Sequence, residues 1–362
     1  MDIKSVYLNG VISKDIYMCQ PKGYKEKGEE GKVAKLKKGL YGLKQAGREW
    51  YATLHDFLIQ LGFTWMHAGH SIFIYQWGTS TIVIPVYIDD KLLAGNDDSL
   101  LDSVQHSIGT HFKTSNLGMA SWILSIHIQH NIMAGTLFID QCQYIKGVLL
   151  RLEMSDCTPI NIPLPAGIQF GPATSDDHTS VSSYPYLEVI RSLMYTVLGT
   201  HLDICSAVRA LAPFAATFGH KHVNGLKHIM KYLSRMKNWG IMYTMSESSL
   251  VGYTNVDWAN DHSNQQSILG YTFLYSGGAV SWMSRQQMTV ADSSTHTEYI
   301  AAAEALKELM WLHRLLTELK EGVPGLTPLH INNCATDLLV QNPVNHSTTV
   351  RESPLLTHPN SF

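Results

Sequence analysis

The sequence predicts a mixed α+β protein built from several domains, and three observations support this. The chain has 362 residues, which exceeds one typical domain. Hydrophobic residues make up 45% and charged residues 16%, a globular composition that excludes a disordered or acidic activation-type protein. Short strand-like runs bounded by turn residues occupy the beginning and the end of the chain, whereas apolar residues recur at helical spacing in between.

Two segments near the beginning of the chain carry acids on expected strands. Met1 to Gly10 reads as a strand closed by an Asn-Gly turn, and Asp2 lies on it. The apolar run of residues 81–86 leads into Tyr87-Ile88-Asp89-Asp90, and a second short run follows at residues 92–95. We expect a hairpin with two acids at its tip, although turn acids are also commonly just solvated.

Three carboxylates, those of Asp2, Asp89 and Asp90, are therefore candidate catalytic residues and candidate metal ligands. Carboxylate oxygens suit hard cations such as magnesium. Two such ions would activate an attacking hydroxyl and stabilise the leaving group of an in-line phosphoryl transfer.

These motifs resemble the reverse transcriptase of copia-type retrotransposon polyproteins. The stretch from Lys35 to Tyr51 is similar to the signature of that family, although Gly47 stands where the family usually has Pro. The resemblance implies a palm and thumb in which Asp2, Asp89 and Asp90 bind two Mg²⁺ ions and extend a DNA primer on an RNA template. In the family a fingers region precedes the first acid. Because it is missing here, we expect the isolated chain to be inactive, and the alternative is a non-specific nucleic-acid-binding remnant.

Basic residues are gathered in two places, although the formal net charge is −3. One is the glycine-punctuated stretch before an expected helix, where Tyr41 and Trp50 would stack on bases or pack in the core. The other is the segment from Lys221 to Lys237, which has no acid. Both would meet the phosphates of a template, primer or RNA–DNA hybrid, and an ordinary solvated face is the alternative. The candidate nucleic-acid-binding residues are Lys35, Lys37, Lys38, Lys44, Gln45, Arg48, Lys227 and Lys231.

The chain is expected to change character near residue 155. Before it we expect a helix over residues 97–112, a strand over 122–128, a return strand over 137–139 and a helix over 141–154. Residues 1–155 would form the palm and thumb. Residues 156–185, rich in Pro, Gly, Ser and Thr, are expected to be a linker, and residues 186–238 a helical connection of three helices.

Residues 239–345 read as three strands, a long helix, a strand and a short helix at residues 335–340, an order that resembles the family's ribonuclease H domain. Residues 346–362 would be a tail. The family's catalytic carboxylates correspond to Asn255, Glu298 and Asn332, so only Glu298 keeps its acid. An amide contributes no negative charge to a metal site, so we expect a ribonuclease H-like domain without activity.

Five scattered cysteines without a C-x-x-C pair indicate reduced thiols and no zinc site. No signal-like segment and no apolar run of membrane-spanning length is present. We therefore expect a cytoplasmic or nuclear protein that does not contact a membrane and uses no small-molecule cofactor besides nucleotide and metal.

Overall fold

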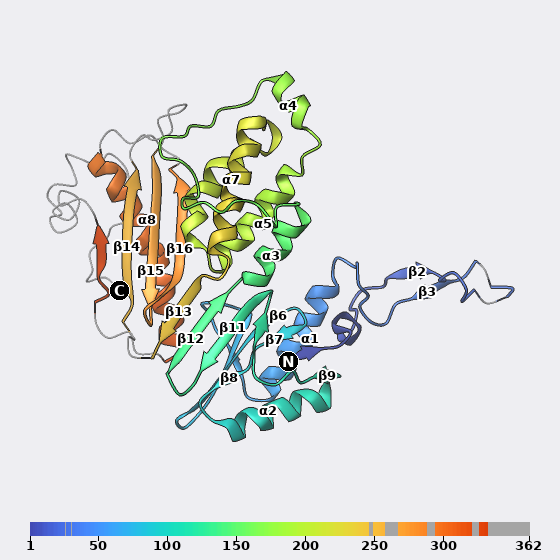
Figure 1. Cartoon of the computed structure of the whole chain (residues 1–362). Helices are drawn as coiled ribbons and strands as arrows, with labels where there is room; N and C mark the ends of the chain where they lie inside the picture. Colours follow the sequence, from blue (N-terminus) through green and yellow to red (C-terminus); the bar gives the residue numbers. More distant parts are fainter. Residues whose placement is uncertain are drawn as a thin grey trace. The chain divides into compact units, whose positions relative to one another are not determined.

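The computed structural model describes residues 1–25, 27–29, 31–245, 249–257, 267–287, 294–320 and 326–331. The chain forms two compact units, one made of Met1–Ala120 with the end of the last helix from Arg314, and one that begins at Ser121. Each unit has its own buried apolar cluster. The mixture of helices and sheets confirms the mixed α and β class (Figure 1).

The first unit is built on a seven-stranded antiparallel sheet in the order β4-β5-β6-β7-β1-β9, with β8 paired to β6. Buried side chains of two helices, such as Trp50 and Ile108, share one core with Phe73 and Ile84 from the sheet. The strands are β1 (Asp2–Ile3), β4 (Thr64–Trp65), β5 (Ile72–Trp77), β6 (Ser80–Tyr87), β7 (Asp90–Lys91), β8 (Ala94–Gly95) and β9 (Thr114–Ser115). The helices are α1 (Ala46–Gln60) and α2 (Asp98–His111).

The strand expected over residues 1–10 is much shorter than predicted. After β1 the chain turns at Ser5, whose φ is 54°, and continues as the 3-10 helix η1 (Val6–Asn9). The Asn9 side chain donates to the carbonyls of Ser5 and Val6, so the Asn-Gly pair closes a helical turn and not a hairpin. Val6 is fully buried, and its burial in the core outweighs the local turn preference.

Between η1 and α1 the first unit forms a two-stranded ribbon. It contains β2 (Tyr17–Cys19) and β3 (Val33–Lys35), which pair antiparallel, and Figure 1 shows it extending away from the sheet of its unit. At its base the N–H of Gly39 donates to the carbonyl of Gly10 at 2.9 Å. A Cβ on Gly39 would lie 2.5 Å from the carbonyl oxygen of Tyr7, so only glycine fits there.

The described part of the second unit contains two four-stranded sheets. In the first, with the order β10-β11-β12-β13, the last strand joins the sheet only after the intervening helices. In the second, with the order β16-β15-β14-β17, only β17 runs parallel to its neighbour. The strands are β10 (Trp122–Ile123), β11 (Ile126–Asn131), β12 (Thr136–Asp140), β13 (Gly240–Thr244), β14 (Val251–Asp257), β15 (Ile268–Tyr275), β16 (Gly278–Gln286) and β17 (Leu329–Ile331).

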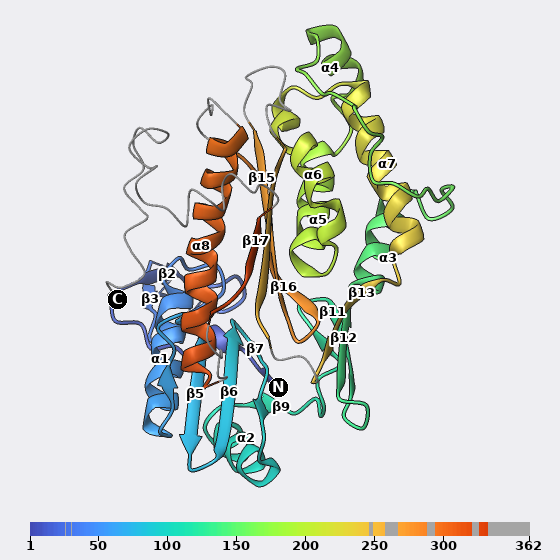
Figure 2. The ribbon, with the colours of Figure 1, turned by 90° about the vertical axis from the view of Figure 1, so that its left-hand side faces the viewer.

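Helices cover both faces of the second sheet, as Figure 2 shows with α8 on one side and α5 and α6 on the other. Trp282 of β16 donates its indole N–H to the carbonyl of Val197 at 3.0 Å, and its neighbour Ser281 donates to Glu308 of α8 at 2.6 Å. The helices are α3 (Cys142–Arg151), α4 (Ser175–Val181), α5 (Tyr186–Gly199), η2 (Leu202–Ile204), α6 (Cys205–Leu211), η3 (Ala212–Ala216), α7 (His220–Met236) and α8 (Ser294–Glu318).

Two expectations differ from the second unit in detail. The single strand over residues 122–128 is a hairpin, because Leu124 and Ser125 have φ of 48° and 60° and reverse the chain between β10 and β11. The segment 156–185 contains the short helix α4 in addition to irregular chain. The short helix expected over residues 335–340 lies outside the described residues. None of the described helices is long and apolar enough to cross a membrane.

Candidate functional site

Two of the three candidate acids stand opposite each other in the first unit. Asp2 of β1 pairs with Asp90 of β7. The N–H of Ile3 donates to the carbonyl of Asp89 at 3.1 Å, and the N–H of Lys91 donates to that of Met1 at 3.0 Å. These bonds flank the pair, so it is a non-hydrogen-bonded pair with Cα atoms about 4.5 Å apart and side chains on one face. Both acids are half-buried.

The third acid lies on the turn between β6 and β7. Tyr87 pairs with Asp90, which leaves Ile88 and Asp89 as a two-residue turn. Ile88 has a φ of 53°, a left-handed conformation that is rare for a β-branched residue. Asp89 is exposed. Across the part of the chain that the structure describes, no three His, Cys, Asp or Glu side chains come close enough together to hold a metal ion.

A buried lysine lies beneath this turn. Lys91 is only 3% exposed, and its Nζ donates to the carbonyls of Ile88 at 3.3 Å and Asp89 at 3.1 Å. Burial lowers the pKa of Lys91 to about 8, while the carboxylates of Asp89, Asp2 and Asp90 act in the opposite direction. Sequence reasoning gave this residue no role. Its burial could have been inferred from its place directly after Asp90, because side chains alternate between the two faces of a strand and that of Lys91 therefore points toward the core.

The acid pair fits a divalent cation whose remaining ligands come from water and substrate. Mg²⁺ is commonly bound by one or two carboxylates together with water and substrate phosphates, without a full protein cage. Asp2 and Asp90 supply two such carboxylates side by side, and Asp89 is their neighbour on the turn.

The first group of candidate basic residues follows the base of the ribbon and the beginning of α1. Its lysines and its arginine are exposed, and Gln45, at the N-cap position of α1, is half-buried. The Nζ of Lys35 lies 2.6 Å from Oδ1 of Asp15. The exposed members of this group are Lys35, Lys37, Lys38, Lys44 and Arg48.

The second group lies on α7, in the other unit. Lys227 is exposed and Lys231 is half-buried, and Lys221 and Arg235 share their face at helical spacing. The Nζ of Lys227 lies 6.0 Å from the centre of the Tyr184 ring. The two basic groups thus belong to different compact units.

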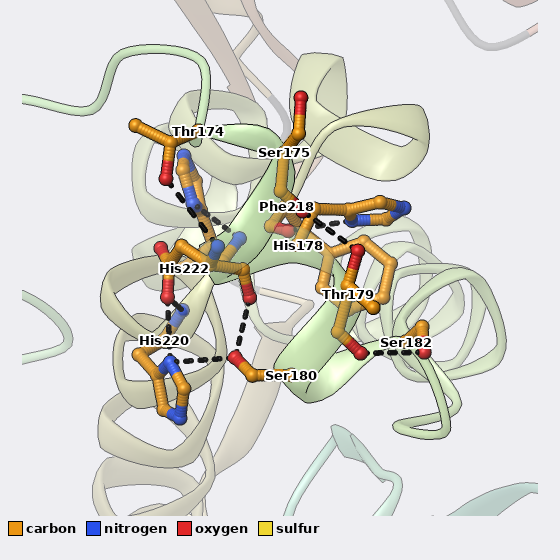
Figure 3. Close-up of polar contacts among 11 residues, drawn as sticks. Thr174, Ser175, His178, Thr179, Ser180, Ser182, Phe218, His220 and His222 are labelled. Atoms are coloured by element: carbon orange, nitrogen blue, oxygen red, sulfur yellow. Dashed lines mark hydrogen bonds and ion pairs between the residues drawn. The ribbon is translucent and has the colours of Figure 1, made fainter.

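A network of polar contacts joins α4 to the beginning of α7 (Figure 3). Oδ1 of Asp177 accepts from the N–H of His220 at 3.2 Å and lies 2.6 Å from its Nδ1. The Oγ of Ser180 lies 3.3 Å from the same nitrogen. A Ser-His-Asp relay uses the two ring nitrogens separately, so this cluster is a structural contact. It fixes the beginning of the helix that carries the second basic group.

The structure describes two of the three candidate positions expected in the ribonuclease H-like segment, Asn255 and Glu298. Asn255 lies on β14 and lines a surface cavity of about 540 Å³ with Tyr253 and His330, whose rings stack at 4.9 Å. None of the described residues that line the cavity is a carboxylate. Glu298 of α8 is 8% exposed, and burial raises its pKa. Asn332 lies outside the described residues.

Comparison with known proteins gives a family for the first part of the chain and relatives for most of its length. Residues 1–166 match the family described as reverse transcriptase (RNA-dependent DNA polymerase). The chain is 34% identical over 324 residues to the retrovirus-related Pol polyprotein from transposon TNT 1-94 of Nicotiana tabacum, which covers 88% of this chain and 24% of that protein. It is 32% identical over 348 residues to the corresponding polyprotein from transposon RE1 of Arabidopsis thaliana, which covers 96% and 23%.

A third relative, the Pol polyprotein from transposon RE2 of Arabidopsis thaliana, is 31% identical over 354 residues, which cover 96% of this chain and 24% of that protein. The chain thus spans about a quarter of the length of these relatives. The resemblance inferred from the sequence motifs is confirmed. The chain belongs with the Pol polyproteins of copia-type retrotransposons and carries their reverse transcriptase domain.

Proposed function

We propose that Asp2, Asp89 and Asp90 form a nucleotidyl-transfer centre that extends a DNA primer on an RNA template. The observation that carries this proposal is the Asp2–Asp90 pair, which places two carboxylates on one face of the sheet inside the reverse transcriptase domain. Two acids directly opposite each other repel, an arrangement that a sheet seldom uses for stability. A positively charged occupant would remove that repulsion.

In the proposed reaction, the side chains of this protein position the reacting groups and supply charge. Asp2 and Asp90 are held by the backbone bonds of β1 and β7, so their carboxylates need little reorganisation before the reaction. Bound Mg²⁺ would offset the phosphate charge and favour the ionised attacking hydroxyl. Lys91 keeps a positive charge buried beneath the turn, where it bonds to carbonyls. The exposed basic residues before α1 would contact the phosphates of template or primer.

We further propose that residues 239–345 form a ribonuclease H-like domain that does not cleave RNA. The order β16-β15-β14-β17, with β17 parallel to β14 and α8 against one face, supports this fold. Asn255 stands where a catalytic carboxylate is expected and cannot supply its charge. Burial raises the pKa of the Glu298 carboxyl, which disfavours the charged form that a metal ion would require.

A second candidate function is binding of nucleic acid without chemistry. The observation that favours it is the lack of any three-ligand metal cluster within the described residues. In this case the basic residues before α1 and on α7 would provide the affinity, and binding would be electrostatic with little sequence preference.

Primer extension on an RNA template separates the two functions. The purified chain is incubated with a DNA primer, nucleotides and either Mg²⁺ or Mn²⁺, beside Asp90→Asn and the control Asp102→Asn, which changes an exposed acid of α2. Extension that Asp90→Asn abolishes and Asp102→Asn retains supports the polymerase. If no chain extends the primer while all three retain the hybrid on a filter, binding alone is the function.

A further inference from the structure

Two buried side chains of the first unit donate hydrogen bonds to one carbonyl oxygen of the turn that carries Asp89. The indole Nε1 of Trp50, on α1, donates to the carbonyl of Ile88 at 3.0 Å. The Nζ of Lys91 donates to the same carbonyl at 3.3 Å and lies 5.2 Å from the centre of the Trp50 ring. Both side chains are 3% exposed, so neither bond is made to a freely moving surface group.

The residue whose carbonyl they hold is in a costly conformation. A β-branched residue such as Ile88 adopts a φ of 53° only when its surroundings impose that conformation. Two convergent donors on its carbonyl are such surroundings. The next two residues are Asp89 and Asp90, so the orientation of this peptide sets the direction of both acids.

We infer that Trp50 is a positioning residue that holds the acid-bearing turn in its strained conformation, with Lys91 as its partner. The inference rests on the proposed function for its biological meaning. Its geometry does not, because the bond from Trp50 to Ile88 exists without any substrate.

The ring of Trp50 is itself fixed, which allows it to act in this way. It packs edge-on against Phe112 with 5.3 Å between the ring centres, and it belongs to the first turns of α1. Arg48, two residues earlier, is exposed. One helix therefore presents a candidate phosphate contact to solvent and a hydrogen-bond donor to the turn.

The test compares Trp50→Phe with Tyr51→Phe. Trp50→Phe keeps an aromatic ring and removes the N–H donor. Tyr51→Phe removes a bond from the neighbouring residue to the carbonyl of His70, which is not part of the turn, and is the matched control. Two readouts are measured, hydrogen exchange of the amides of Asp89 and Asp90, and Mn²⁺ binding by electron paramagnetic resonance.

We expect Trp50→Phe to speed exchange at these two amides about fivefold to tenfold, as expected for one lost hydrogen bond, and to weaken Mn²⁺ binding. Tyr51→Phe should change neither. Equal effects of both variants, or exchange in Trp50→Phe within twofold of the parent (~0.4 kcal/mol), would overturn the inference.

A second pair of variants keeps the test decisive if Trp50→Phe lowers global stability. Ile88→Asn places a residue that tolerates the left-handed conformation at the strained position. In that background Trp50→Phe should accelerate exchange less than in the parent, and an undiminished effect contradicts the inference. Absence of primer extension in the parent chain would remove the proposed function and leave these exchange results interpretable.

Discussion

Asp2 and Asp90 face each other across β1 and β7 as a non-hydrogen-bonded pair, the closest arrangement that an antiparallel sheet offers to two side chains. Two carboxylates in this arrangement repel each other unless a cation lies between them. We therefore expect a divalent cation bound between the two carboxylates to raise the stability of the first unit.

The first prediction is that Asp90→Asn stabilises the chain in metal-free buffer. Removing one of two opposed charges should raise the free energy of unfolding by roughly 0.2 to 1 kcal/mol, while Mn²⁺ binding weakens. Urea unfolding with and without Mn²⁺ measures both effects. Asp102→Asn should change neither, and a loss of stability in metal-free Asp90→Asn would show that the carboxylate serves the fold.

The second prediction concerns the basic face of α7. Lys227→Gln should weaken binding to an RNA–DNA hybrid uniformly across sequences and lower the slope of log affinity against log salt by about 0.9 if this side chain meets one phosphate. Lys146→Gln makes the same charge change on an exposed position of α3 and serves as control. Identical slopes for the two variants would exclude α7 from the binding surface.

Local signals predicted most helices of the chain well. The helix expected over residues 97–112 is α2, because Asp97 caps it by accepting from the N–H of Leu100 at 3.1 Å and its apolar residues recur with helical period. The helix over residues 141–154 is likewise found as α3. Such elements depend on neighbours along the chain, which a sequence displays directly.

Contacts between distant segments could not be predicted in the same way. Asn9-Gly10 was interpreted as a hairpin turn, but the burial of Val6 leads the chain into a 3-10 helix instead. The acid hairpin was recognisable from its motif, whereas the burial of Lys91 depends on Trp50, which lies on another element. Side-chain packing between such elements has no signature in either segment alone.

The third prediction follows from the reversal at Leu124 and Ser125. A φ of 60° at Ser125 costs a residue with a Cβ about 1 kcal/mol, partly offset in glycine by its freer unfolded state. Ser125→Gly should therefore raise the free energy of unfolding by about 0.5 kcal/mol. Ser121→Gly, just before the hairpin and without a positive φ, should not, and equal gains from both would refute the explanation.

The fourth prediction concerns Glu298, whose pKa is raised by burial. As pH rises through its ordinary value of 4.5, the unfolded chain releases this proton first, so the group lowers stability with increasing pH. Glu298→Gln should therefore be more stable than the parent near neutral pH and similar at about pH 4. Thermal unfolding at both pH values measures this, with Asp156→Asn as an exposed control. If Mg²⁺ stabilised the parent but not Glu298→Gln, Glu298 would belong to an intact metal site.

The last prediction concerns the contact that begins α7. The N–H of Gly219 donates to Nδ1 of His222 at 3.0 Å, a bond that the ring can accept only while this nitrogen carries no proton. His222 is 2% exposed, and burial lowers its pKa below the ordinary value of 6.5. The nearby Asp177 favours the protonated ring, whereas Lys221 opposes it.

Because the folded pKa of His222 is depressed, the unfolded chain binds more protons once the pH falls below 6.5. The stability that the neutral ring contributes is therefore fully present above that pH and declines as the pH falls below it. Urea unfolding at about pH 7.5 and about pH 5.5 should show a smaller loss of stability in His222→Gln than in the parent. His130→Gln, which changes an exposed histidine of β11, should retain the full loss. If His222→Gln and the parent lose the same stability, the bond to Gly219 does not govern the pH response.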